Sequence, residues 1–131
     1  MKLFVTALLL AAVEAGHKGK GSRRNWKCAK AEMVEANNSA VAGTVQFFQK
    51  DEDADTRIIA ELSGVSPPGR HGFHIHENGA LTNECADAGG HFNPDGFDHG
   101  APTNDAADRH IGCLGNIYAN PDGDATYFNY D

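Results

Sequence analysis

Residues 72–77 read Gly-Phe-His-Ile-His-Glu, and this stretch determines how the chain folds and what it can bind. In a β-strand, alternate side chains lie on the same face, so His74 and His76 project together. The apolar side chains of Phe73 and Ile75 then face the opposite side and pack inward. Imidazole suits copper and zinc, whereas magnesium and calcium take mainly oxygen ligands. The stretch therefore predicts half of a transition-metal site.

The rest of such a site has to come from the segment that follows. Residues 78–109 show no hydrophobic periodicity and are rich in Gly, Asn, Asp and Pro. A structureless loop of this length is unusual in a compact domain unless it is functional. Three more histidines lie in or directly after it, at His91, His99 and His110. We therefore expect a site built from one strand and one long loop, which the metal ligands organise.

Strands are predicted on both sides of this loop. Residues 41–50 show the alternation of a half-buried strand, with Val41, Val45 and Phe47 separated by more polar neighbours. The six predicted strands cover residues 31–36, 41–50, 57–65, 71–77, 111–119 and 125–130. The last two form a hairpin across residues 120–123. No helix or repeat is predicted, so the fold class is all-β, and 131 residues support a single domain.

Four segments of the chain resemble the copper/zinc superoxide dismutase family, and they occur in the family's order. They are residues 72–77, 89–94 (Gly-Gly-His-Phe-Asn-Pro), 99–102 (His-Gly-Ala-Pro) and 109–112 (Arg-His-Ile-Gly). The resemblance extends from about residue 31 to residue 131, and it implies a Greek-key β-sandwich or barrel. We expect the family's last two strands to be missing, together with the fourth copper histidine, the charged loop that guides superoxide and the arginine beside the copper.

The resemblance also implies a ligand set. His74, His76 and His91 are expected to bind copper and to be the catalytic residues. His91 is expected to bridge to zinc, and His99 and His110 to complete three of the four zinc positions. His71 lies on the strand face opposite His74 and His76, which predicts a buried histidine that joins strand and loop by hydrogen bonds.

Cysteines mark two departures from the family pattern. Where the family has an aspartate as the fourth zinc ligand, this chain has Cys113. A thiolate is a good zinc ligand, and the alternative is that Cys113 is oxidised, in a pair with Cys28, which would leave the zinc site weak or empty. Cys85 stands where the family has the cysteine that ties this loop to the barrel, and its partner would lie beyond residue 131.

The N-terminal segment predicts secretion. Residues 1–15 combine Lys2, an apolar run over residues 3–13 and a small-residue cleavage site, which is typical of a signal peptide. The apolar run is too short to span a membrane. An extracellular protein meets an oxidising environment, in which disulfide bonds persist. In that setting Asn37, in the triplet Asn-Asn-Ser, is a candidate for N-glycosylation.

Charge divides the rest of the chain into a basic tail, residues 16–30, and a domain, residues 31–131. The net charge is −7, yet the tail is basic. Its basic residues are Lys18, Lys20, Arg23, Arg24, Lys27 and Lys30. Such a segment is either a solvated, flexible tail or an electrostatic tether to a cell-surface polyanion. The acidic body argues against nucleic acid as a partner.

Two functions remain open. The resemblance implies an enzyme that dismutates superoxide to oxygen and hydrogen peroxide, with copper alternating between its +2 and +1 states and His91 passing a proton to the peroxide. The alternative is a non-catalytic extracellular metal-binding or carrier protein on the same fold, and a third reading is a structural module that keeps only the zinc-like loop. The expected partners are superoxide, a second copy of the chain in a homodimer, and the polyanion.

Overall fold

The computed structural model describes residues 26–34 and 40–131. The predicted signal peptide, most of the predicted basic tail and Asn37 lie outside these residues. Within them, no helix is both long enough and apolar enough to cross a membrane.

The described residues form an all-β fold of antiparallel strands, as the alternating pattern predicts. The strands are β1 (Lys27–Met33), β2 (Ala42–Gln49), β3 (Arg57–Ser63), β4 (Gly69–His74), β5 (Cys113–Ala119) and β6 (Ala125–Tyr130). Two short 3-10 turns, η1 (Asn83–Ala88) and η2 (Ala106–Asp108), lie in the long loop between β4 and β5.

The first strand lies earlier in the chain than the sequence pattern predicts. β1 covers Lys27–Met33 rather than residues 31–36, and it pairs with β2 from Lys27↔Gln49 to Met33↔Gly43. The expected tail boundary at residue 30 is therefore wrong, because Lys27 and Lys30 belong to the sheet. Lys30 lies on the solvent-facing side of this edge strand, opposite the buried Ala31 and Met33, and Lys27 is exposed at the start of the strand.

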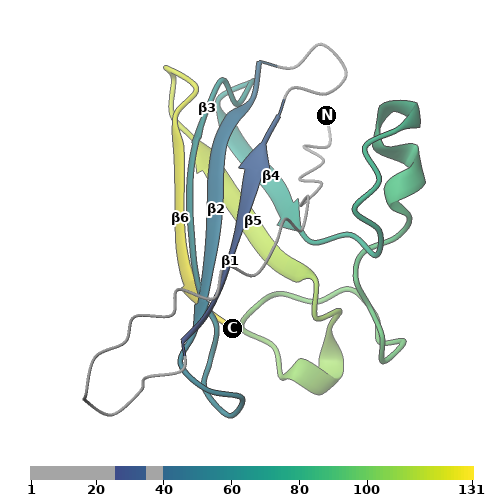
Figure 1. The fold of residues 1–131 in the computed structure, drawn as a ribbon. Coiled ribbons are helices and arrows are strands. Elements are labelled where there is room, and N and C mark those ends of the chain that lie inside the picture. The colour runs from purple at the N-terminus through teal and green to yellow at the C-terminus, as the bar shows by residue number, and fades with distance from the viewer. Residues whose placement is uncertain (1–25, 35–39) are drawn as a thin grey trace, which may run out of the picture.

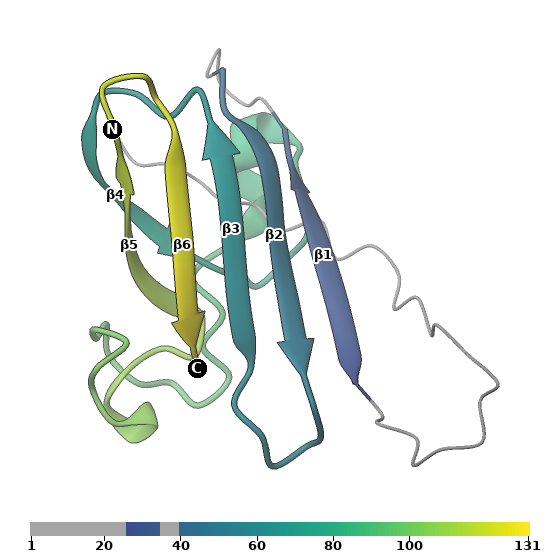
Figure 2. The ribbon, with the colours of Figure 1, turned by 90° about the vertical axis from the view of Figure 1, so that its left-hand side faces the viewer.

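The strand order is β1-β2-β3-β6-β5-β4, so β6 lies between β3 and β5 and the chain crosses over between β3 and β4. This order has the Greek-key character that the family resemblance implies. β5 pairs with β6 only at Tyr118↔Thr126 and Ala119↔Ala125, next to their connecting turn. The two strands then diverge, and the sheet folds over itself. β4 and β5 run obliquely to the layer of β1, β2, β3 and β6 and pass behind it at β6 (Figures 1 and 2).

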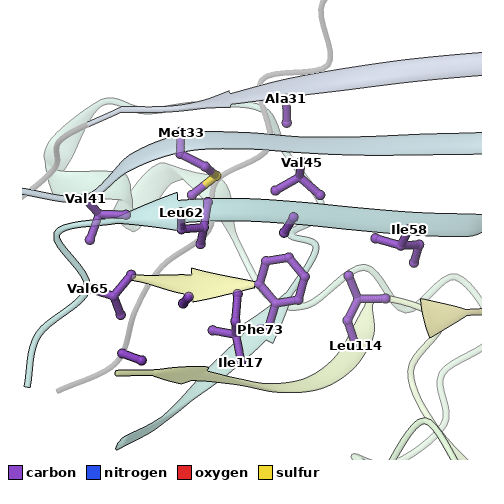
Figure 3. Close-up of a cluster of buried hydrophobic side chains, with 13 residues drawn as sticks. Ala31, Met33, Val41, Val45, Ile58, Leu62, Val65, Phe73, Leu114 and Ile117 are labelled. Atoms are coloured by element: carbon purple, nitrogen blue, oxygen red, sulfur yellow. The ribbon is translucent and has the colours of Figure 1, made fainter. Parts of the chain in front are cut away.

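The hydrophobic core fills the space between these two layers. Val45, Ile58 and Leu62 from the first layer face Phe73 and Ile117 from the second (Figure 3). Phe73 is only 1% exposed, and burial of such a side chain contributes about 1.5–3 kcal/mol. Because Phe73 is held in the core, the next residue, His74, has to face the other side of β4.

Candidate metal centre

A β-bulge brings the end of β4 beside the start of β5. Gly72 pairs with Asn116, whereas His74 pairs with Cys113, so β5 has one residue more than β4 between these pairs. Gly115 lies in this bulge with φ +86°, a conformation that favours glycine. The bulge therefore places His74 opposite Cys113 in the register of the paired strands.

Beyond β4, the backbone joins three segments that are far apart in sequence. The N–H of Ile75 donates to the carbonyl of Gly112 at 2.8 Å, and the N–H of Phe92 donates to the carbonyl of Ile75 at 2.8 Å. The N–H of Gly112 donates to the carbonyl of Phe92 at 2.9 Å and closes the triangle. An isolated antiparallel bridge pairs His76 with His91. The predicted fourth strand, residues 71–77, thus ends at His74, and its last residues bind the loop instead.

The first group of candidate ligands is His74, His76 and His91. One ligand atom from each lies within 4.8 Å of the others. The rings of His74 and His91 stack with centroids 3.8 Å apart, and those of His74 and His76 lie 4.9 Å apart. Nδ1 of His76 donates to the carbonyl of Gly89 at 3.0 Å. Such a bond orients a ligating imidazole and leaves Nε2 to bind the metal.

The second group is His91, His99, His110 and Cys113, again within 4.8 Å of one another. Sγ of Cys113 lies 3.4 Å from Nδ1 of His91 and 3.5 Å from Nδ1 of His99. Nδ1 of His110 is buried and makes no hydrogen bond within the described part of the chain. A buried polar atom without a partner is costly, and a cation between these donors would satisfy it.

The spacing of the second group fits zinc. Zinc binds nitrogen at about 2.0–2.1 Å and thiolate sulfur at about 2.3 Å in a tetrahedron, which requires a sulfur–nitrogen separation of about 3.5 Å. The observed separations at Cys113 are 3.4 and 3.5 Å. Imidazole nitrogen and thiolate sulfur are both ligands that zinc accepts in a tetrahedral site. The four side chains could therefore hold zinc with little rearrangement.

His91 is the one residue that the two groups share. Its Nδ1 faces Cys113 in the second group, so Nε2 is the atom that it can offer to His74 and His76. The structure thus brings together all six residues that were expected to bind metal.

The other predictions for histidine and cysteine can now be assessed. His71 is 5% exposed, and its Nε2 donates to the carbonyl of Pro67 at 2.7 Å, which confirms a buried histidine that joins strand and loop. All three cysteines of the sequence lie within the described residues, and each is a free thiol. The structure therefore does not contain the alternative Cys28–Cys113 pair: Cys28 is exposed, whereas Cys113 is buried against the histidines.

Sequence reasoning did not find the ion pair that holds the loop beside the site. Arg109 and Asp131 form a hydrogen-bonded ion pair whose side chains are 8% and 14% exposed. Arg109 also donates from Nη1 to the carbonyl of His110 at 3.4 Å. Arg109 directly precedes the candidate ligand His110, and this position was a signal that the arginine has a role at the site. Nothing in the sequence near Asp131 indicated that Asp131 would be its partner.

Tyr127 supports the inner side of the centre. Its ring lies 4.9 Å from that of Phe73, and its hydroxyl donates to the carbonyl of Leu114 at 2.7 Å. Burial raises the pKa of Tyr127, because the phenolate would be poorly solvated there. The tyrosine therefore stays neutral and keeps donating to the backbone next to Cys113.

An open cavity of about 1100 Å³ borders the centre. His74, His76, His91 and His99 all line it, as do Arg70 and Tyr118. A small solute can therefore reach the first group of ligands from solvent.

Several known proteins are similar in sequence to a large part of this chain. The sequence profile of a family described as copper/zinc superoxide dismutase matches residues 41–131. An extracellular copper-zinc superoxide dismutase of Drosophila melanogaster is 46% identical over 96 residues, which are 72% of this chain and 51% of the relative. The copper-zinc superoxide dismutase of Cordyceps militaris is 51% identical over 96 residues, which are 73% of this chain and 61% of the relative. That of Candida albicans is 49% identical over 94 residues, which are 72% of this chain and 60% of the relative. The chain thus spans about half to three fifths of the length of these relatives.

Proposed function

Because the chain belongs to the copper/zinc superoxide dismutase family, we propose that it binds copper and zinc side by side and dismutates superoxide to oxygen and hydrogen peroxide. His74, His76 and His91 would hold the copper, and His91, His99, His110 and Cys113 would hold the zinc. The observation that carries this proposal is the position of His91, which belongs to both groups and directs its Nδ1 at Cys113.

The bound metals and the protein supply different parts of this reaction. Copper would supply the one-electron chemistry that oxidises one superoxide and reduces the next, while zinc keeps its oxidation state. His91 can hold a proton at Nε2 and release it toward the cavity, while its Nδ1 remains directed at Cys113. The hydrogen bond from His76 to Gly89 keeps a second imidazole in place during this exchange.

The second group of ligands also has a structural task. His99 and His110 lie in and at the end of a long loop in which the described residues form only short 3-10 turns. A metal that joins them to Cys113 on β5 would order this loop. Binding and folding of such a segment are coupled, so zinc should stabilise the chain as well as orient His91.

An extracellular location is part of the proposal. It is supported by the apolar run over residues 3–13 and by the likeness to a relative that is named extracellular. Expression of the full chain in a eukaryotic secretory host provides the test. The medium should contain a product whose N-terminus is Gly16, and full retention of an uncleaved chain inside the cells would contradict secretion.

Superoxide consumption by the chain loaded with copper and zinc tests the enzymatic proposal. We expect activity in the wild type and in Cys28→Ser, whose thiol is exposed on β1, and loss of at least 100-fold in His74→Ala. Circular dichroism shows whether the variants fold. Rates that equal those of His74→Ala or of free copper would reject the enzyme and favour the alternative, a metal-binding or carrier protein, for which the stoichiometric binding of both metals is the expected property.

A further inference from the structure

We propose that His91, His99, His110 and Cys113 also form a copper(II)–thiolate site, so that the chain binds two copper ions when zinc is withheld. The inference rests on the proposed function in one respect, because the copper would bind the same four side chains that are proposed to bind zinc. It adds a second metal for that site and makes the thiolate of Cys113 a direct ligand of that metal.

The geometry places the sulfur where a metal could bond to it directly. Sγ of Cys113 lies within 3.5 Å of two ring nitrogens, on His91 and His99. The rings of His99 and His110 have centroids 4.2 Å apart, and the buried Nδ1 of His110 makes no hydrogen bond in residues 26–34 and 40–131. One ion could therefore contact three imidazoles and the sulfur together.

The chemistry of these donors favours copper. For a given set of nitrogen and sulfur ligands, divalent copper binds more tightly than zinc, so a site excludes copper only through its geometry or its choice of donors. The family resemblance leads one to expect a hard carboxylate at the position of Cys113, but this chain supplies a soft thiolate. Imidazole together with thiolate is the donor combination of copper sites with strong visible colour. The substitution removes a feature that would have disfavoured copper.

Copper binding at Cys113 needs no further reactant. Copper(II) replaces the proton of the Cys113 thiol, the proton passes to solvent, and the ion keeps its oxidation state. The side chain of Cys113 is buried, with the residue 6% exposed. Its peptide N–H donates to the carbonyl of His110 at 3.0 Å, which holds the sulfur beside the histidines. Burial of the sulfur keeps external thiols and oxidants away from the copper–sulfur bond.

Copper titration of the reduced, metal-free full chain provides the test. With CuSO4 as the only metal and spectra recorded immediately after anaerobic mixing, we expect two copper ions per chain and a strong thiolate-to-copper absorption band in the visible range. Cys113→Ser should lose the band at least tenfold. Cys113→Asp should bind two ions without the band. His74→Ala should keep the band, because the thiolate site does not include His74, and Cys28→Ser and Cys85→Ser should keep it as well.

The outcomes separate this inference from the proposed function. Two copper ions without a visible band, or a band that persists in Cys113→Ser, would overturn the copper–thiolate site. If the chain binds zinc at Cys113 and consumes superoxide but shows no band with copper alone, only the further inference is rejected. If the chain shows the band but consumes no superoxide when it is loaded with both metals, only the enzymatic proposal is rejected.

Discussion

Gly112 is the residue at which three backbone segments of the metal centre meet. A Cβ atom at this position would lie 2.6 Å from the carbonyl oxygen of Ile75 and 3.0 Å from the backbone of Phe92. Because these neighbours are backbone atoms, Gly112→Ala requires a shift of the chain itself. We expect a loss of roughly 1–3 kcal/mol in the free energy of unfolding, and a fall of about 10- to 100-fold in zinc affinity. Urea denaturation and a zinc competition titration measure the two effects.

Gly90 provides a matched control for this prediction. It directly precedes His91, but a Cβ there would lie 3.7 Å from its nearest neighbour, the carboxylate of Glu77, which is an ordinary contact. Gly90→Ala should therefore change the free energy of unfolding by less than about 0.5 kcal/mol. Equal zinc affinities in the two variants would show that the close crossing at Gly112 is not needed to shape the site.

At the level of the elements, Tyr127 joins β6 to the part of β5 that carries Cys113. Its hydroxyl donates to the carbonyl of Leu114, so Tyr127→Phe should lower the free energy of unfolding by about 1 kcal/mol. Burial raises the pKa of Tyr127 in the folded chain. Above about pH 10 an unfolded tyrosine has lost its proton while the folded one retains it, so stability should fall as pH rises. Urea denaturation between pH 8 and 11 should show a shallower decline in Tyr127→Phe.

Tyr130 lies on the same strand and is 56% exposed, which makes Tyr130→Phe the control for Tyr127→Phe. It should leave the stability at pH 8 close to that of the wild type. If the two variants behave alike, the contact between Tyr127 and Leu114 does not contribute to the connection between β5 and β6.

For the molecule as a whole, the pair of Arg109 and Asp131 connects the metal loop to the end of the sheet. Asp131 is itself held at Thr56 by backbone hydrogen bonds of 2.7 and 3.0 Å. Asp131→Ala leaves the buried guanidinium without its carboxylate, and such a loss costs about 3–5 kcal/mol. We expect a fall of this order in the free energy of unfolding, together with weaker zinc binding, because His110 follows Arg109. Thermal and urea unfolding with and without zinc measure both.

Two further variants distinguish a buried pair from an exposed one. Arg109→Met combined with Asp131→Leu removes both charges and should regain part of the stability lost in Asp131→Ala. Glu52→Ala breaks the solvent-exposed pair with Lys27 and should leave stability nearly unchanged. If Glu52→Ala and Asp131→Ala had equal effects, the Arg109–Asp131 pair would not anchor the loop.

The candidate ligands of the metal centre could largely be predicted, because they lie in short sequence motifs. The two-residue period of a β-strand predicts that His74 and His76 project together, and the same period places Phe73 in the core. The start of β1 was not predictable from charge, because Lys27 and Lys30 suit a solvent-facing strand position as well as a tail. A local pattern cannot distinguish the two without knowledge of the neighbouring strand β2.

The sequence by itself therefore determined the strand type, the inward position of Phe73 and the identity of the candidate ligands, since these depend on short local motifs. Only the tertiary structure decided that Cys113 lies beside His91 and His99 rather than in a pair with Cys28, and that Arg109 is joined to Asp131. The physical reason is that such contacts depend on the bulge between β4 and β5 and on the register of the paired strands. These features arise when distant segments pack together, and no local periodicity encodes them.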